Sequence, residues 1–318
     1  MHYNLDKAFK QIGEYGRAQW LLTFVNCIAR NGGTYVYYPF AYLVLEQQFL
    51  CYDPASILSP PTQCTAADVC AARDVDPLYS AYEVDKSYQY YLDNWFTQMD
   101  LLCYTPAKIG MMISAYYVGF AVGGLFCAFP DRYGRRKSCM LGLALSTISQ
   151  TVMLFSSSFW VRFAMFFLSG FSQIKNSVSY VWLSECTSKP YKALSFTYIN
   201  IVDALPIVLT CLFYMFVSKN WLHLPLLFTV LSYLALFLAY VCPESPRWLL
   251  VNGRSQEAIA ELNKIASMNK ASKSIPTNAM FVEDPTHIQA LIEGASRRSE
   301  GMVEVIDISP TLNKENDT

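Results

Sequence analysis

Long apolar runs joined by short polar connectors dominate this chain. Each run is about 20 residues long, which is the length that an α-helix needs to cross a bilayer. The runs are continuous rather than alternating, so they favour helices over membrane-spanning strands. They predict an all-α polytopic membrane protein with six transmembrane helices. The expected spans are residues 18–45, 107–129, 138–156, 160–184, 194–217 and 221–241.

Positive charges mark one side of this predicted topology. The connector at residues 129–139 is densely basic, and the N-terminal segment at residues 1–17 is basic as well. Short loops rich in Lys and Arg stay on the cytoplasmic side, so we expect both termini to be cytoplasmic. The N-terminus has no apolar core or cleavage site of a signal peptide. We therefore expect an integral protein of the plasma membrane.

The overall composition supports a lipid environment. Apolar residues make up 53% of the chain and charged residues only 15%, whereas soluble domains have about 25% charged residues. A net charge of -1 argues against a nucleic-acid partner. The lipid bilayer is thus the first expected partner, with residues 106–243 forming the bundle of spans two to six.

Two polar segments lie outside the expected bundle. Residues 46–105 form a long loop with an even number of cysteines, which predicts two disulfides if the loop is extracellular. The sequence does not distinguish the three possible pairings of Cys51, Cys64, Cys70 and Cys103. Residues 244–270 carry apolar positions at helical spacing and predict an amphipathic cytoplasmic helix. Residues 271–318 are polar, and we expect them to be largely disordered, with one helical turn near 287–293.

Charged and polar residues interrupt three of the apolar spans. A charge at the bilayer centre costs about 2.5–3.5 kcal/mol, so such a residue faces a protein interior or water. These residues are our candidate substrate pathway, with a structural ion pair as the alternative. The pathway candidates are Arg30, Asn31, Tyr35, Tyr38, Lys175, Asn176 and Asp203.

Helix geometry gives the distance of two of these charges from the cytoplasmic ends of their spans. Lys175 and Asp203 each lie about nine residues from the cytoplasmic end of their spans, which places both at about 13 Å. We expect them to form a buried ion pair or to share one site. Arg30 lies about one turn higher, unless it snorkels outward from a shorter helix. Two cations facing one anion slightly favour an anionic or zwitterionic solute.

The basic connector predicts a specific turn. In its sequence D-x-x-G-R-R-K, we expect Asp131 to cap a helix or form a pair, and Gly134 to supply a tight backbone turn. Arg135 would pair across the bundle. The alternative is that the connector only anchors the topology.

Four motifs carry a resemblance to a known family. DRYGRRKS at residues 131–138 resembles the signature between spans two and three of major facilitator transporters. GEYGRAQ at 13–19, QMDLLC at 98–103 and PESPRWLL at 243–250 resemble motifs of the organic cation, anion and carnitine transporters. The long cysteine-bearing first loop is also typical of that branch. Sugar porters share PESPR and the basic connector but lack this loop, so they are the second choice.

The resemblance implies a cytoplasmic charge network that locks the outward-facing state. Two positions depart from the family pattern: Cys127 replaces a glycine, and Lys192 replaces an arginine. The network residues implied by the resemblance are Asp131, Gly134, Arg135, Glu185, Glu244 and Arg247.

The resemblance also implies transport of small organic ions without covalent chemistry. The chain shows no nucleotide-binding loop, metal-ligand spacing or catalytic triad, so we expect no enzyme activity, no cofactor and no metal. Family members have twelve spans, whereas this chain resembles only the N-terminal half, about residues 10–268. A partial carrier would need a second copy or a separate C-terminal half. A non-transporting scaffold or regulatory half-transporter is the competing class.

Overall fold

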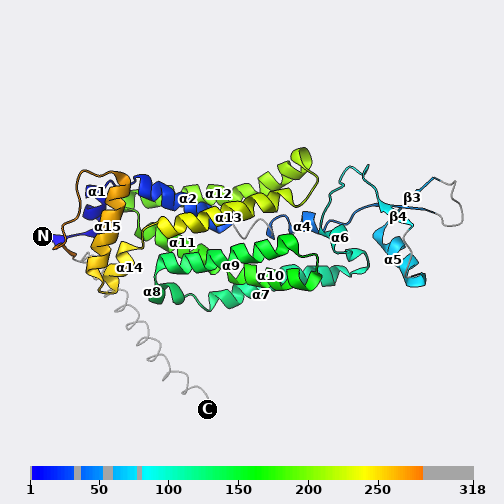
Figure 1. Cartoon of the computed structure of the whole chain (residues 1–318), viewed down its shortest axis with the longest axis horizontal. Helices are drawn as coiled ribbons and strands as arrows, with labels where there is room; N and C mark the ends of the chain where they lie inside the picture. The colour runs from blue at the N-terminus through cyan, green and yellow to red at the C-terminus, as the bar shows by residue number, and fades with distance from the viewer. Residues whose placement is uncertain (1, 32–36, 53–59, 77–80, 282–318) are drawn as a thin grey trace, which may run out of the picture.

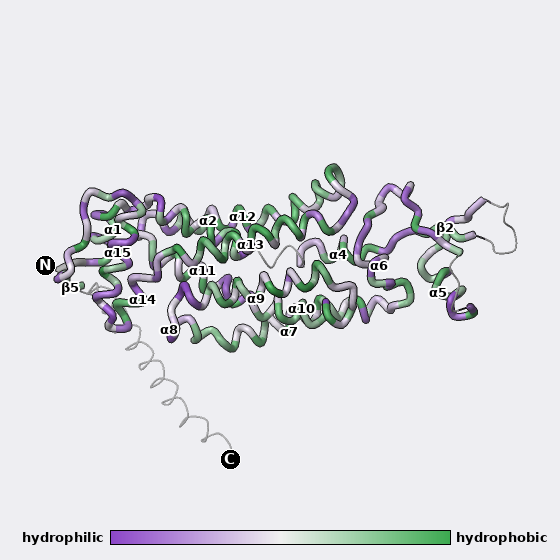
Figure 2. Tube along the Cα trace, in the orientation of Figure 1, coloured by the Kyte–Doolittle hydropathy of each residue, from purple (hydrophilic) through white to green (hydrophobic). Residues whose placement is uncertain are grey.

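Helices running roughly side by side along the long axis form the body of the molecule (Figure 1). The computed structural model describes residues 2–31, 37–52, 60–76 and 81–281. We call the end that carries α1, α14 and α15 the base, and the end that carries α5 and β2–β4 the loop end. Hydrophobic residues predominate on the helices between these two ends, while hydrophilic residues are more frequent at the base and in the loop (Figure 2). This distribution fits a bundle that crosses a membrane.

The body consists of long helices whose sequences are mostly apolar. Their bounds are α2 Arg17–Asn31, α7 Pro106–Gly124, α9 Arg135–Phe155, α10 Phe159–Phe171, α11 Ile174–Glu185, α12 Lys192–Leu212 and α13 His223–Val241. Within the described residues, three stretches are long and apolar enough to cross a membrane, namely Arg135–Phe155, Lys189–Val217 and His223–Val241. They coincide with the third, fifth and sixth predicted spans. The helical fold class predicted from the sequence is confirmed.

The other three predicted spans are not single long helices. In the first span, α2 is described over Arg17–Asn31, residues 32–36 lie outside the described residues, and a short helix, α4 (Phe40–Leu43), follows the turn at Pro39. The second span is shorter than predicted, because α7 ends at Gly124 and a separate helix, α8 (Phe129–Tyr133), precedes the basic turn. Weak helix propensity at the terminal glycines of α7 explains its earlier end.

A break divides the fourth predicted span into α10 and α11. The side chains of Ser172 and Gln173 both donate to the Ser169 carbonyl, at 2.6 and 3.2 Å. The backbone N–H of Gln173 donates to the Gly170 carbonyl, three residues back, at 3.0 Å instead of to the residue four back. Such side-chain bonds compete with the regular helical pattern and explain the interruption.

Glycines allow α7 and α10 to pack backbone against backbone. A Cβ atom at Gly170 would lie 1.9 Å from the Tyr116 carbonyl oxygen. A Cβ at Gly119 would lie 2.1 Å from the Phe167 carbonyl oxygen, so both contacts exclude any side chain. Small residues serve the same purpose in other membrane helix pairs, since they let the backbones approach closely.

The loop end adds a small sheet to an otherwise helical fold. Strand β2 (Phe49–Cys51) pairs antiparallel with β3 (Thr62–Cys64) and with β4 (Tyr82–Val84). The loop end also contains the helices α5 (Ala66–Val75) and α6 (Trp95–Gln98) and the 3-10 turn Leu101–Cys103. The Thr65 amide and hydroxyl donate to Asp68 at the start of α5, and these bonds lower the pKa of that carboxyl.

Two disulfides close this loop. Cys51 is bonded to Cys64, with Cα atoms 5.9 Å apart, and Cys70 is bonded to Cys103, with Cα atoms 5.3 Å apart. The first bond crosslinks β2 to β3, and the second ties α5 to the 3-10 turn. The structure therefore selects one of the three pairings that the sequence left open.

Peptide mapping without reduction tests these pairings. We expect the peptides that contain Cys51 and Cys64 to be linked to each other, and those that contain Cys70 and Cys103 likewise. The exposed thiol of Cys127 should be alkylated without reduction and serves as the internal control. A crosslink between Cys64 and Cys70 would contradict the structure.

The base is a small folded unit beneath the bundle. Helix α1 (Leu5–Gln11) packs with α15 (Ser255–Asn269), and β1 (His2–Tyr3) pairs in parallel with β5 (Met280–Phe281). Helix α14 (Pro246–Val251) joins the end of α13 to this unit. The apolar face of α15 that the sequence indicated is buried here, through Ala258, Ile259, Leu262, Ile265 and Ala266.

The first part of the polar tail differs from its prediction. Ile275 and Ala279 are buried in the base, so residues 271–281 are ordered by packing rather than disordered. Apolar burial stabilises this segment even though its overall composition is polar. The rest of the tail, including the expected helical turn near 287–293, lies outside the described residues.

Candidate functional site

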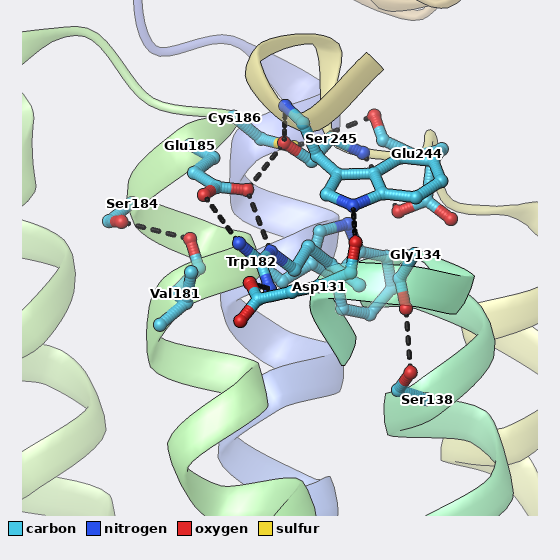
Figure 3. Close-up of polar contacts among 12 residues, drawn as sticks. Asp131, Gly134, Ser138, Val181, Trp182, Ser184, Glu185, Cys186, Glu244 and Ser245 are labelled. Atoms are coloured by element: carbon cyan, nitrogen blue, oxygen red, sulfur yellow. Dashed lines mark hydrogen bonds and ion pairs between the residues drawn. The ribbon is translucent and has the colours of Figure 1, made fainter. Parts of the chain in front are cut away.

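Charged side chains from three segments meet where the bundle joins the base (Figure 3). Arg135, the first residue of α9, bonds to Asp131 at 2.5 Å and to the end of α11 through Glu185 at 3.2 Å. The Arg135 and Glu185 side chains are only 14% and 12% exposed. Arg135 therefore pairs across the bundle, as predicted from the sequence of the basic connector.

Glu244 acts on backbone groups rather than on a cation. Its Oε1 accepts the backbone N–H of Arg136 at 2.8 Å and that of Ser245 at 3.0 Å. Helix α9 has no side-chain cap of its own, so Glu244 supplies an acceptor and a negative charge at the positive end of this helix. The network role implied for Glu244 stays a prediction, and its contacts among the described residues are to backbone N–H groups.

Gly134 makes room for this arrangement. Its φ of 103° is accessible mainly to glycine, and a Cβ atom there would lie 2.8 Å from Glu244 Oε2. Arg247, by contrast, lies in the first turn of α14, is exposed, and forms no salt bridge with a described residue. Its implied place in the charge network is not supported, because α14 presents it to the surface.

Sequence reasoning missed three neutral members of this site. The Ser245 hydroxyl donates to Glu185 at 2.6 Å, and the Trp248 indole donates to the Asp131 carbonyl at 2.7 Å. The Trp182 indole donates to the Pro243 carbonyl at 3.0 Å. Ser245 could have been found, because a serine followed by proline is typical of a helix start. The tryptophans gave no such signal.

The base also holds the start of α2. Asn269, the last residue of α15, accepts the Ala18 amide at 2.8 Å and donates to the Ile12 carbonyl and to Gln19 at 3.1 Å. A Cβ atom at Gly16 would lie 2.4 Å from this side chain. The GEYGRAQ motif is therefore fixed by a residue about 250 positions downstream, which no local pattern could reveal.

A second polar cluster lies deeper in the bundle, on α2, α11 and α12. Arg30 bonds to Asp203 at 3.1 Å, with side chains 12% and 26% exposed. The Arg30 guanidinium also lies over the Tyr180 ring, 4.3 Å from its centroid, and the Tyr180 hydroxyl donates to Asn200 at 2.5 Å. This cluster thus combines one ion pair with an aromatic ring and an amide, all of them at least partly exposed.

Lys175 does not join that pair. It is completely buried, and its ammonium group donates to Gln173 at 3.2 Å. It packs on α9, where a Cβ atom at Gly142 would lie 2.8 Å from Lys175 Cβ. The expected ion pair between Lys175 and Asp203 is not among the described salt bridges, because residue counting gives the height of a side chain but not its direction around the helix. The alternative, that the two residues share one site, stays a prediction.

The remaining pathway candidates differ in burial and in their contacts. Asn176 donates to Gln173 at 2.9 Å, and Asn31 is buried and donates to the Cys27 carbonyl at 2.8 Å. Tyr38 is half-buried and contacts the edge of Tyr37. Tyr35 lies outside the described residues.

Tyrosines of spans one and two meet. Tyr37 stacks on Tyr116 with ring centroids 4.8 Å apart, and its hydroxyl is hydrogen-bonded to that of Tyr117. These rings extend the aromatic surface near Arg30.

A cavity of about 220 Å³ lies between α7, α8 and α11, next to the Asp131–Arg135 pair. Cys127, the residue in place of the family glycine, lines it. Among the described residues, no group of His, Cys, Asp or Glu side chains is arranged to hold a metal ion.

Comparisons with known proteins agree with this architecture. A family model described as sugar (and other) transporter matches residues 72–294. The human organic cation/carnitine transporter 2 is 28% identical over 226 residues, which is 70% of this chain and 39% of that protein. The organic cation/carnitine transporter 6 of Arabidopsis thaliana is 27% identical over 272 residues, covering 79% of this chain and 50% of that protein.

Two solved structures also align with this chain at low identity. The xylose transporter XylE of E. coli aligns over 91% of this chain and 61% of its own, with 14% identity and a TM-score of 0.47. The human organic anion transporter MFSD10 aligns over 72% of this chain and 48% of its own, with 17% identity and a TM-score of 0.45.

The family model covers more than half of the chain. The chain belongs to the sugar (and other) transporter family, and its relatives include the organic cation and carnitine transporters. The resemblance drawn from the sequence motifs is confirmed. The chain spans about 40–50% of the length of these two relatives.

Proposed function

We propose that this chain forms the six-helix half of a transporter for small organic ions, with a solute site at the Arg30–Asp203 cluster. The observation that carries the proposal is one accessible ion pair beside aromatic rings, on membrane helices of a transporter family. Both charges are partly exposed, so a solute can reach them. The names of the relatives support organic cations and carnitine-like zwitterions as the solute class.

The ion pair offers a cation, Arg30, to an anionic group of a solute and a carboxylate, Asp203, to a cationic group. Arg30 bonds to Asp203 through a single N–O contact, and Arg30 Nε is buried without a partner. An uncompensated charge in a low-dielectric interior is costly. A zwitterion could replace both halves of the pair at once, its carboxylate on Arg30 and its cation on Asp203. This favours zwitterions within the proposed solute class.

The proposal includes an orientation and a partner. We place the base in the cytoplasm and the disulfide-bonded loop outside, in the plasma membrane, because the basic turn lies at the base. Rocking of two halves around a central site requires a second six-helix unit. That unit would be a second copy or a separate C-terminal half. The network of Asp131, Arg135 and Glu185 would then gate the cytoplasmic side.

Uptake into liposomes tests the function. The full chain would be reconstituted alone and together with a separately expressed C-terminal half from a relative. Labelled tetraethylammonium, carnitine and benzoate would serve as cation, zwitterion and anion probes. We expect uptake of carnitine above that of empty liposomes. Asp203→Asn and Arg30→Gln should each lower it by about ten-fold or more, because each variant strands the opposite charge.

Lys108→Gln is the matched control for charge removal. Lys108 lies over the Tyr104 ring at the loop end, away from the cluster, so uptake should be unchanged. Equal uptake by Asp203→Asn and the unmodified chain would reject the assigned site. Absence of uptake for all three probes in both preparations would reject transport and favour a scaffold role.

A further inference from the structure

Arg162 is a buried cation that neither the charge network nor the solute cluster uses. It is the fourth residue of α10, near the loop end, and its side chain is completely buried. It lies beside the aromatic cluster around Trp95 and Phe166. No salt bridge joins Arg162 to a described residue, although a buried charge is normally paired.

Two aromatic rings lie beside its guanidinium. The Arg162 guanidinium carbon lies 4.2 Å from the Trp95 ring centroid and 5.2 Å from that of Trp221. Trp95 and Trp221 are themselves in edge contact, with centroids 5.5 Å apart. Cation–π contacts of this kind stabilise a cation, but they supply no carboxylate or carbonyl oxygen to its N–H groups.

The edge of the guanidinium is only partly used. Arg162 Nη2 donates to Gln98 at 2.7 Å, while Nε and Nη1 are buried without a partner. The Trp95 indole nitrogen is also buried without a partner. Buried donors that lack acceptors cost about 1–3 kcal/mol each, more for charged groups. Three such donors on two residues in contact are therefore unusual.

The start of α10 adds further positive potential. Arg162 lies in the first turns of this 13-residue helix, whose N-terminus has no side-chain cap. The N-terminal end of a helix carries a partial positive charge. The surroundings thus combine a full charge, an uncapped helix end and three unpartnered donors, with no described carboxylate to balance them.

We propose that Arg162 and Trp95 bind a small inorganic anion of the halide class at the loop end of the bundle. The anion accepts from Arg162 Nε or Nη1 and from the Trp95 indole, the three buried donors that lack a partner. Complete burial of Arg162 excludes a bulky organic anion. Gln98, which accepts from Arg162 Nη2, is itself exposed, so the site lies close to the surface of the loop end. The bound anion would tie the loop to α10 and is separate from solute transport.

Thermal unfolding of the purified full chain tests this site. Sodium chloride would replace sodium gluconate at constant ionic strength, so that general screening stays the same. We expect the Tm to rise with chloride in a saturable manner, by about 2–4 °C. Bromide should act similarly, and its anomalous scattering would locate the ion beside Arg162. An identical Tm in chloride and gluconate would overturn the proposal.

Three variants separate the site from ordinary packing. Trp95→Phe removes one donor and keeps a ring, so it should weaken the apparent affinity for chloride several-fold. Arg162→Gln should abolish the chloride response. Arg73→Gln is the matched control, because Arg73 is a loop-end arginine already paired with Asp100 at 2.8 Å, and its chloride response should persist. A full chloride response in both Trp95→Phe and Arg162→Gln would reject the site, and Trp95→Phe keeps the test valid if Arg162→Gln fails to fold.

Discussion

Gly170→Ala is expected to prevent stable folding of the bundle. The added Cβ atom would lie 1.9 Å from the Tyr116 carbonyl oxygen and 3.0 Å from the Phe120 amide nitrogen. Both neighbours are backbone atoms of α7, so no side-chain rotation can relieve the contact, and the two helices must separate. We expect a loss of at least about 3 kcal/mol in the free energy of unfolding. Thermal unfolding and size-exclusion profiles in detergent would measure it.

Gly124→Ala provides the matched control for this prediction. Gly124 is the last residue of α7, and a Cβ atom there would have no neighbour within 4 Å. Alanine is the better helix former by about 1 kcal/mol, so the variant should be neutral or slightly more stable. If Gly170→Ala were as stable as Gly124→Ala, the backbone contact between α7 and α10 could not exist as described.

The features that could be predicted from the sequence are those that depend on apolar runs and on the spacing of nearby residues. Apolar runs located the helices, and the face of α15 followed from the spacing of residues such as Ile259 and Leu262. The D-x-x-G-R motif indicated the turn at Gly134 and the pairing of Arg135. These features follow from short-range patterns, because each depends on chain geometry within a few residues.

The partners of buried polar groups could not be predicted in this way. Arg30 rather than Lys175 contacts Asp203, because the rotation of α11 directs Lys175 towards α9. Glu244 caps α9, which begins about 110 positions earlier in the chain, and Asn269 holds the start of α2. Each of these contacts joins segments far apart in sequence, so it depends on the packing of whole helices rather than on a local signal.

Arg162 shows a further limit of reading the sequence. An arginine near the end of an apolar run fits ordinary snorkelling towards the membrane surface. In the structure its side chain is completely buried, because Trp95 and Trp221 come from the loop and from the start of α13 to cover it. Only the packing of the loop on the bundle makes this charge unusual.

Glu185→Gln is expected to weaken the junction between the bundle and the base. Glu185 accepts from Arg135 at 3.2 Å and from the Ser245 hydroxyl at 2.6 Å, so it joins α9 and α14 to the end of α11. The amide keeps the shape but removes the charge that balances a largely buried Arg135. Because Asp131 still pairs with this arginine, we expect a loss of about 2 kcal/mol, below the full cost of breaking a buried pair. Chemical or thermal unfolding would measure the change.

Glu257→Gln gives the comparison that separates burial from charge alone. Glu257 also pairs with an arginine, Arg254, at 2.6 Å, but both side chains are exposed on the base. The Arg254 guanidinium lowers the pKa of the Glu257 carboxyl, yet water and salt screen an exposed pair strongly. We therefore expect no measurable change in Tm for Glu257→Gln. Equal effects of the two substitutions would mean that Glu185 acts as a surface charge, and the described network would not be the element that holds α9, α11 and α14 together.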